Sequence, residues 1–144
     1  MLTVVAGVLA LLCLGGVATA LVWYNRASTP DRSTPDVAVI NYLQATLVSG
    51  DPNRAKLFTC HGAVPSVDEF AAEVARREQE LGVSFSINIE DVVVTETAGT
   101  EATVIAVIRR SASIDGIHQS LADTWQFDLN NREGWRVCAG SRIS

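Results

Sequence analysis

The sequence has no charged residue before Arg26, no run of basic residues and only one lysine. Sixteen Asp and Glu against eleven Lys and Arg give a net charge of −5, which argues against binding of a nucleic-acid phosphate backbone. There is no glycine-rich phosphate loop and no G-x-S-x-G turn. The two histidines, His61 and His118, lie at no spacing typical of metal ligands. We therefore expect neither a metal ion nor another cofactor.

What the chain does contain is a long apolar segment, residues 2–24, with no charge at all. About 22 residues of helix extend about 33 Å, which matches the hydrocarbon thickness of a bilayer. Trp23, Tyr24 and Arg26 follow in the order that is typical of a membrane interface. We predict a transmembrane anchor over residues 1–24 that contacts the plasma membrane through residues 2–24. The alternative is a signal peptide cleaved after Ala18-Thr19-Ala20, although the apolar run continues beyond that point.

Two signals disagree on which side of the membrane the remaining residues lie. Arg26 and Arg32 follow the apolar segment, and the positive-inside rule taken literally places everything after it in the cytoplasm. Cys60 and Cys138 are widely separated, have no C-x-x-C spacing and form a reasonable structural disulfide if this part is exported. We give the cysteines more weight and expect a single-pass protein whose domain is extracytoplasmic. Two unpaired thiols in a reducing compartment remain the alternative, and Cys13 lies within the apolar segment.

Residues 25–34 are polar and contain proline, which predicts a linker, and residues 35–144 have the length of one domain. Three helices are expected first. One begins at Pro35 and ends near Gly50, a short one follows Asp51-Pro52, and the third begins with a capping box formed by Ser66 and Glu69. The expected apolar stripes are Val37, Ile40, Leu43 and Leu47 in the first helix, Ala55, Leu57 and Phe58 in the second, and Val67, Phe70, Val74 and Leu81 in the third.

After Gly82 the apolar period changes from 3.6 to 2, which predicts strands. The alternation slips across Glu90-Asp91, so we expect a bulge there. Residues 102–108 are apolar on both faces, as in a central strand, and Asp115-Gly116 predicts a tight hairpin. The next strand places Leu121, Trp125, Phe127 and Leu129 on one face, and the last runs from Trp135 to Cys138. The predicted fold class is α+β, with about three helices packed on a curved four-stranded antiparallel sheet.

These residues resemble the cystatin-like cone of nuclear-transport-factor-two-like and ketosteroid-isomerase-like domains. The resemblance covers about residues 36–139. It rests on the pattern Val39, Tyr42, Leu43, Leu47, Gly50, Asp51, Ala55 and the region of Leu57, on the cysteine at its end, and on the closing Gly134-Trp135-Arg136-Val137-Cys138. More narrowly, the chain is similar to the exported version carried by single-pass actinobacterial envelope proteins, including mammalian-cell-entry-associated membrane proteins. The resemblance implies that a Cys60–Cys138 bond ties the helices to the last strand. Strict alternation, however, places Cys138 opposite Trp135 and Val137, so either the strand twists or the pairing fails.

The interior of such a cone is a recurrent ligand site, and we expect its pocket to be lined by Tyr42, Phe70, Val74, Asp123, Trp125 and Phe127. An isomerase-like site needs a carboxylate base and an acid that donates to an oxyanion. Asp123 is the one inward carboxylate, but a structural pairing with Arg109 or Arg110 has more weight. Tyr42 is equally well explained as a core aromatic residue.

No group of polar residues with an evident catalytic role emerges from the sequence. We therefore expect no enzyme but a membrane-anchored accessory domain that interacts with a protein of the cell envelope. The alternative is a domain that binds a small apolar ligand or lipid in the cone. An isomerase or dehydratase that uses Asp123 is the third and weakest hypothesis.

Overall fold

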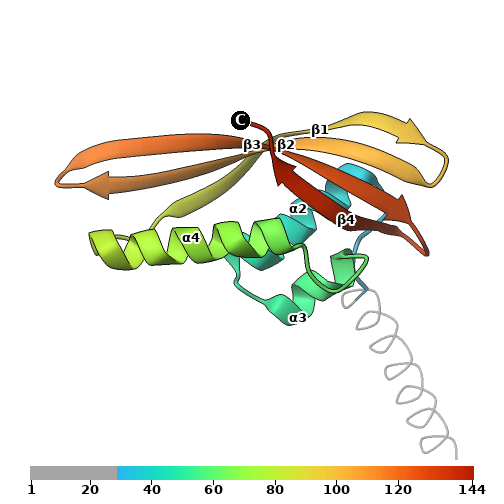
Figure 1. Cartoon of the computed structure of the whole chain (residues 1–144), viewed down its shortest axis with the longest axis horizontal. Coiled ribbons are helices and arrows are strands. Elements are labelled where there is room, and N and C mark those ends of the chain that lie inside the picture. Colours follow the sequence, from blue (N-terminus) through green and yellow to red (C-terminus); the bar gives the residue numbers. More distant parts are fainter. Residues whose placement is uncertain (1–28) are drawn as a thin grey trace, which may run out of the picture. The chain divides into compact units, whose positions relative to one another are not determined.

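The computed structural model describes residues 29–144, and within them a layer of helices covers one face of a single curved sheet (Figure 1). The helices are α2 (Pro35–Leu43), α3 (Pro52–Ala55) and α4 (Pro65–Leu81). Four antiparallel strands follow in the spatial order in which they occur along the chain: β1 (Ser86–Ala98), β2 (Glu101–Ile114), β3 (Ile117–Asn131) and β4 (Trp135–Arg142). This arrangement confirms the predicted α+β class.

The described residues include no helix that is both long enough and apolar enough to cross a bilayer. The predicted anchor over residues 1–24, Cys13 and the first part of the predicted linker lie outside the described residues. Residues from Asp31 to Ser144 form one compact unit. Two residues of the predicted linker are hydrogen-bonded to the domain. The Asp31 carbonyl accepts from the Asn41 side chain, and the Arg32 carbonyl accepts from the Trp135 N–H.

The first helix buries a different face from the one that the sequence predicts. Ala38, Val39, Tyr42 and Leu43 are buried, whereas Val37, Ile40 and Leu47 are only partly buried. The helix continues through a π-helical turn (Gln44–Val48) and ends before Gly50, which has a φ of 60°. The helix is apolar on most sides, so the sequence did not indicate which face is buried. The π turn also changes the direction of every side chain that follows it.

The cap predicted for α4 is wrong, whereas its buried face is largely confirmed. The N-cap is Val64, two residues before the predicted Ser66, Pro65 lies in the first turn, and the helix has no side-chain cap. The Ser66 hydroxyl instead donates to the Gly140 carbonyl at 2.5 Å, which connects α4 to β4. Val67, Phe70 and Val74 are buried, but Leu81, in the last turn, is 46% exposed.

The sheet follows its predicted turns and bulges closely. The register between β1 and β2 shifts between Glu90 and Val93, as expected, and again between Val94 and Glu96. Asp115 and Gly116 both have positive φ, 52° and 79°, which is the type I′ hairpin turn. β2 lies between β1 and β3, with its even-numbered residues from Ala102 to Ala112 buried against the helices. This alternation determines which polar side chains of β2 point inward.

One bulge in β4 was not predicted, and it explains how Cys138 is paired. Leu129 pairs with Val137 but Asp128 pairs with Ala139, so Cys138 is the extra residue of a bulge. Cys138 forms a disulfide with Cys60, and their Cα atoms lie 4.8 Å apart. Thr59 forms a parallel bridge with Val137, and the Cys60 N–H donates to the Val137 carbonyl. The bond therefore lies at the outer edge of the sheet, where the parity of β4 changes.

Candidate functional site

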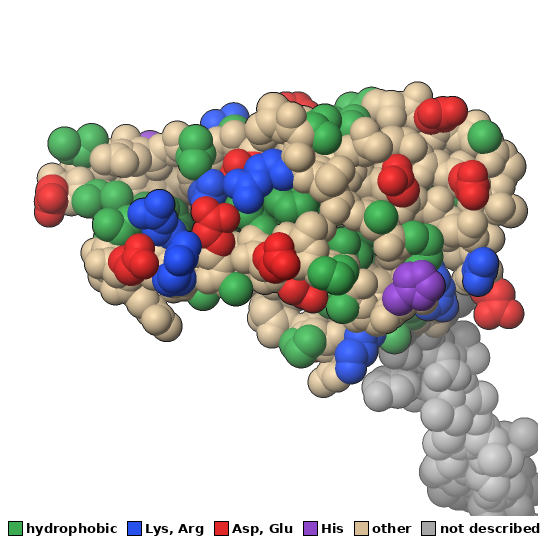
Figure 2. Space-filling view, in the orientation of Figure 1, with side chains coloured by type: hydrophobic (Ala, Val, Ile, Leu, Met, Phe, Trp, Pro, Cys, Tyr) green, Lys and Arg blue, Asp and Glu red, His purple; other side chains and the backbone are tan. Residues whose placement is uncertain are grey.

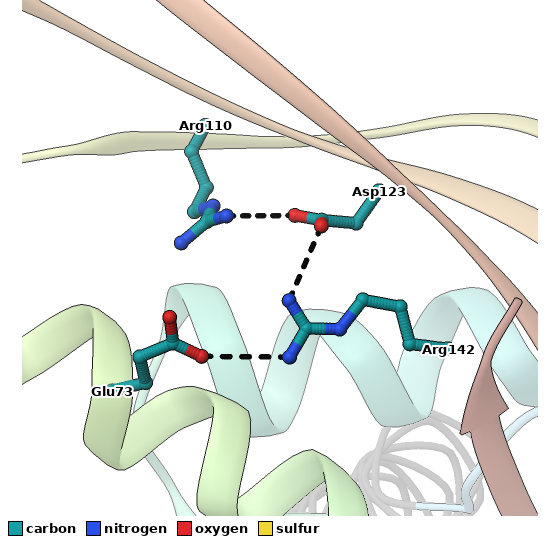
Figure 3. A network of polar contacts seen from close by, with 4 residues as sticks. All are labelled: Glu73, Arg110, Asp123 and Arg142. Atoms are coloured by element: carbon teal, nitrogen blue, oxygen red, sulfur yellow. Dashed lines mark hydrogen bonds and ion pairs between the residues drawn. The ribbon is translucent and has the colours of Figure 1, made fainter. Parts of the chain in front are cut away.

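An ionic network with a buried centre lies between α4 and the inner face of the sheet (Figure 3). Asp123 accepts a hydrogen bond from Arg110 at 2.9 Å and forms an ion pair with Arg142 at 3.3 Å. Glu73 of α4 contacts the same Arg142 guanidinium at 3.5 Å. Asp123 and Arg110 are the only buried charged residues among residues 29–144. Figure 3 shows the Asp123 carboxylate between the two guanidinium groups.

Strand alternation brings Arg110 and Asp123 together, and the bulge adds Arg142. Even-numbered residues of β2 point inward, so Arg110 follows Ile108 onto the helix-facing side. Before the bulge, the inward residues of β4 are Trp135 and Val137. After it the parity is inverted, and Arg142 pairs with Trp125 of β3, whose side chain is buried. Arg142 was not predicted, because the last strand expected from the sequence ends at Cys138, whereas β4 continues to Arg142.

Aromatic rings support the two guanidinium groups. The Cζ of Arg110 lies 4.9 Å from the centre of the Phe70 ring, and the Cζ of Arg142 lies 5.5 Å from it. The Phe70 and Trp125 rings pack edge to face at 5.4 Å, and Trp125 stacks on Phe127 at 6.1 Å. Contacts of this kind stabilise a desolvated cation by about 1–2 kcal/mol. The network is therefore held in place by packing as well as by charge.

The residues predicted to line a pocket are placed in the core. Phe70, Trp125 and Phe127 pack against one another, and Val74, 8% exposed, belongs to the same hydrophobic cluster. Tyr42, 1% exposed, belongs to this cluster too, and it also borders a cleft of about 300 Å³ among the helices that includes Asp51 and Asp68. Burial raises the pKa of Tyr42 to about 12. Among the predicted pocket residues, Asp123 therefore contacts the arginines of the network. Tyr42 borders a different cleft, which contains none of them.

A groove of about 410 Å³ opens beside the network, between α4 and the β2–β3 hairpin. Arg110 reaches it from the sheet, and its Nε is buried without a hydrogen-bond acceptor. Apolar and polar side chains share the rest of its wall: Glu73, Arg77, Leu81, Phe85, Ile114, Gln119, Ser120 and Leu121. Leu121 is 58% exposed, so this wall presents apolar surface to solvent. Such a groove suits a small ligand with one polar and one apolar part.

A second cleft, of about 440 Å³, lies beside the disulfide. It is lined by Cys60, His61, Asn130, Arg132, Glu133, Arg136 and Cys138. Figure 2 shows a histidine next to Lys and Arg side chains at the end of the domain away from the β2–β3 hairpin. In the part of the chain described here, no three His, Cys, Asp or Glu residues are grouped so that they could hold a metal ion.

No protein-family profile and no curated protein sequence matches the chain significantly. Solved structures do resemble it. A protein of unknown function from Mycobacterium tuberculosis is 16% identical, with a TM-score of 0.51, over 74% of this chain and 66% of its own. A ketosteroid isomerase-like protein from Erwinia carotovora atroseptica is 22% identical, with a TM-score of 0.49, over 76% of this chain and 94% of its own.

A nuclear-transport-factor-two-like protein from Rhodospirillum rubrum is 19% identical, with a TM-score of 0.45, over 72% of this chain and 93% of its own. Every one of these identities is below 25%, so the similarity concerns the fold alone. The Mycobacterium tuberculosis protein, with a TM-score above 0.5, shares its fold with this chain. Proteins with this fold include enzymes and proteins without catalysis, and function must be argued from the site.

Proposed function

We propose that this protein is a membrane-anchored accessory domain on the extracytoplasmic face of the plasma membrane, where it binds a protein of the cell envelope and catalyses no reaction. The proposal combines three features. They are the uncharged apolar residues 2–24, the Cys60–Cys138 bond and the ionic network around Asp123.

The state of Asp123 carries the proposal. A general base must lie within hydrogen-bond reach of the substrate proton that it abstracts. Both Asp123 oxygens already accept from guanidinium groups, Oδ2 from Arg110 and Oδ1 from Arg142. Asp123 is 7% exposed, and the Phe70 and Trp125 rings pack against the guanidinium groups that it contacts. This arrangement favours a structural ion pair over a catalytic carboxylate, and an isomerase or dehydratase that uses Asp123 stays the weakest hypothesis.

The extracytoplasmic location is supported by the disulfide, because bonds of this kind persist in oxidising compartments and are rare in the cytosol. It can be tested by labelling intact cells with a membrane-impermeant maleimide, using a Cys13→Ala variant so that only Cys60 and Cys138 remain. We expect labelling only after an external reductant is added, without permeabilisation. Labelling that needs permeabilisation but no reductant would place free thiols in the cytoplasm and reject the proposal.

The partner is tested separately, by chemical crosslinking of the full chain in intact cells followed by purification under denaturing conditions. We expect one defined crosslinked species with another envelope protein. A chain that remains uncrosslinked and monomeric in its native membrane would contradict the accessory role while leaving the topology result unaffected.

The groove at Arg110 favours a second candidate function, the binding of a small ligand. The buried Nε of Arg110 lacks an acceptor, and Leu81, Leu121 and Phe85 offer apolar contacts nearby. A ligand with an anionic head and an apolar tail would satisfy both parts of the wall. This function predicts that the full chain in lipid nanodiscs retains more radiolabelled octanoate than the same nanodiscs with the Leu121→Asp variant. A Leu57→Asp variant is the control, because Leu57 has similar exposure and lies outside the groove.

A further inference from the structure

The cleft beside the disulfide lies among basic residues at one end of the domain, which we name the cationic face: the cations Arg32, Lys56, Arg132 and Arg136, and the imidazole of His61. His61, Arg132 and Arg136 line the cleft itself, and the Cγ of Lys56 lies 4.0 Å from where a Cβ on Gly62 would stand. The chain as a whole has a net charge of −5, so this group of positive charges is opposite in sign to the net charge of the chain.

Backbone contacts, rather than opposite charges, hold Arg32 in this face. The Arg32 side chain donates to the Leu57 carbonyl at 3.0 Å, and its own carbonyl accepts from the Trp135 N–H at 3.0 Å. A Cβ on Gly134 would approach Arg32 to 3.1 Å, so close packing requires glycine there. The fold therefore fixes this guanidinium beside the β3–β4 turn.

Arg32 lacks a full set of partners. Its Nε is buried with no acceptor. Burial, and then the positive charge of Arg136, lower the pKa of Arg32, while Glu133 acts in the opposite direction. The other nearby carboxylate, Asp31, accepts hydrogen bonds from the Ser33 N–H and hydroxyl. An external anion would relieve the repulsion between Arg32 and Arg136.

The position of the cationic face along the chain indicates which kind of anion it would bind. Asp31 is the first residue of the compact unit, so the preceding residues leave the domain beside Arg32. Only residues 25–30 separate Asp31 from the apolar residues 2–24. Six extended residues reach at most about 20 Å. With residues 2–24 in a bilayer, as proposed above, so short a tether would hold this face near the lipid headgroups.

We propose that the cationic face docks on a membrane surface that contains anionic lipids and so orients the domain on the bilayer. The inference rests on the proposed membrane anchor, but it concerns contacts that the anchor alone does not make. Attraction between the basic residues and anionic headgroups supplies the contact, so it weakens with salt.

The two histidines make a direct test. His61 lies in the cationic face, whereas His118 pairs with Ser113 near the tip of the β2–β3 hairpin, and both are exposed. The full chain is incorporated into nanodiscs of neutral lipid or of neutral lipid with 30% phosphatidylglycerol and is treated with diethyl pyrocarbonate. Mass spectrometry then gives the modification rate of each imidazole. We expect His61 to react at least threefold more slowly on the anionic discs, with His118 unchanged and with the difference lost in 1 M NaCl.

Charge variants locate the effect. Lys56→Glu combined with Arg132→Glu changes two exposed residues and should abolish the protection of His61. Arg76→Glu combined with Arg77→Glu removes the same charge from the exposed side of α4 and should leave the protection intact.

Each contrary result has its own meaning. A chain that does not co-purify with the discs would reject the anchor, and the docking proposal with it. If the chain stays on the discs and His61 reacts at the same rate on both lipids, docking is rejected and the proposed anchor is not. Protection of His61 by inorganic phosphate on neutral discs, and not by anionic lipid, would assign the cleft to a soluble anion and also overturn docking.

Discussion

Asp123 lies on the inner face of β3 with an arginine on either side. At the scale of the residue, its environment explains why an inward carboxylate does not by itself indicate catalysis. The two guanidinium groups, stacked on Phe70, offset the cost of burying the carboxylate. A buried ion pair contributes little net stability, but the removal of one partner leaves a buried charge uncompensated.

Asp123→Asn should therefore destabilise the domain by about 3–5 kcal/mol, because Arg110 would remain buried without its counter-charge. Urea denaturation followed by tryptophan fluorescence measures the change. Asp128→Asn, on an exposed position of the same strand, is the control and should cost much less. Equal stability of Asp123→Asn and the wild-type chain would show that Asp123 is not a structural ion-pair partner.

The raised pKa of Tyr42 predicts that the domain loses stability at alkaline pH. Its pKa is about 12 in the folded domain, against the ordinary value of 10.0. The unfolded chain loses the phenolic proton first, so stability is complete below pH 10 and falls as the pH rises from 10 to 12, by about 2–3 kcal/mol. Tyr42→Phe should remove this part of the pH dependence. Identical stability profiles of the variant and the wild-type chain across this range would contradict the prediction.

At the scale of the element, the bulge at Cys138 organises the end of the sheet. It changes which residues of β4 face the helices, so that Gly140 and Arg142 point inward after Trp135 and Val137. A single extra residue thus positions both the disulfide and the second partner of Asp123. Glycine is needed at position 140 because the Phe127 ring and α4 approach the backbone closely.

Gly140→Ala tests that close approach. The added Cβ would lie 2.8 Å from the Phe127 ring and 3.4 Å from Val64, so one of the packed groups must move. We expect a loss of about 1–3 kcal/mol in the free energy of unfolding, measured by urea denaturation. Ser141→Ala, at the neighbouring exposed position, should be nearly neutral. A Gly140→Ala variant as stable as the wild type would show that β4 can shift away from Phe127.

Much of this organisation follows from local sequence patterns, and the misses have local causes. The Asp115-Gly116 hairpin and the Glu90-Asp91 bulge were predicted because each has its own turn or alternation signal. The alternation of β3 also placed Asp123 inward correctly. The β4 bulge had only an indirect signal, the conflict between strict alternation and the expected pairing of Cys138, and this conflict did not reveal an extra residue. Arg142 and the true N-cap of α4 were missed since both depend on tertiary contacts.

At the scale of the whole molecule, the disulfide links the helical half of the domain to the last strand over a separation of 78 residues. On the chain-entropy model, closing a loop of that length stabilises the folded state by about 4.5 kcal/mol. This is a large share of the 5–15 kcal/mol that is typical of a domain.

Cys60→Ala combined with Cys138→Ala should therefore lower the free energy of unfolding by up to about 4–5 kcal/mol. The comparison uses urea denaturation of the oxidised wild type, the reduced wild type and the double variant. The reduced chain and the double variant should behave alike. A reduced chain that is as stable as the oxidised one would mean that tertiary packing alone holds Thr59 and Cys60 against β4.

The bridge between Thr59 and Val137 also affects how copies of the protein meet one another. β4 is an outer strand, and a bare outer strand offers unpaired amide groups on which another chain can assemble. The segment at Thr59–Cys60 occupies part of that border, and the covalent link holds it there. Severing the link would expose this border and favour self-association, so an oxidising environment protects the protein from aggregation as well as from unfolding.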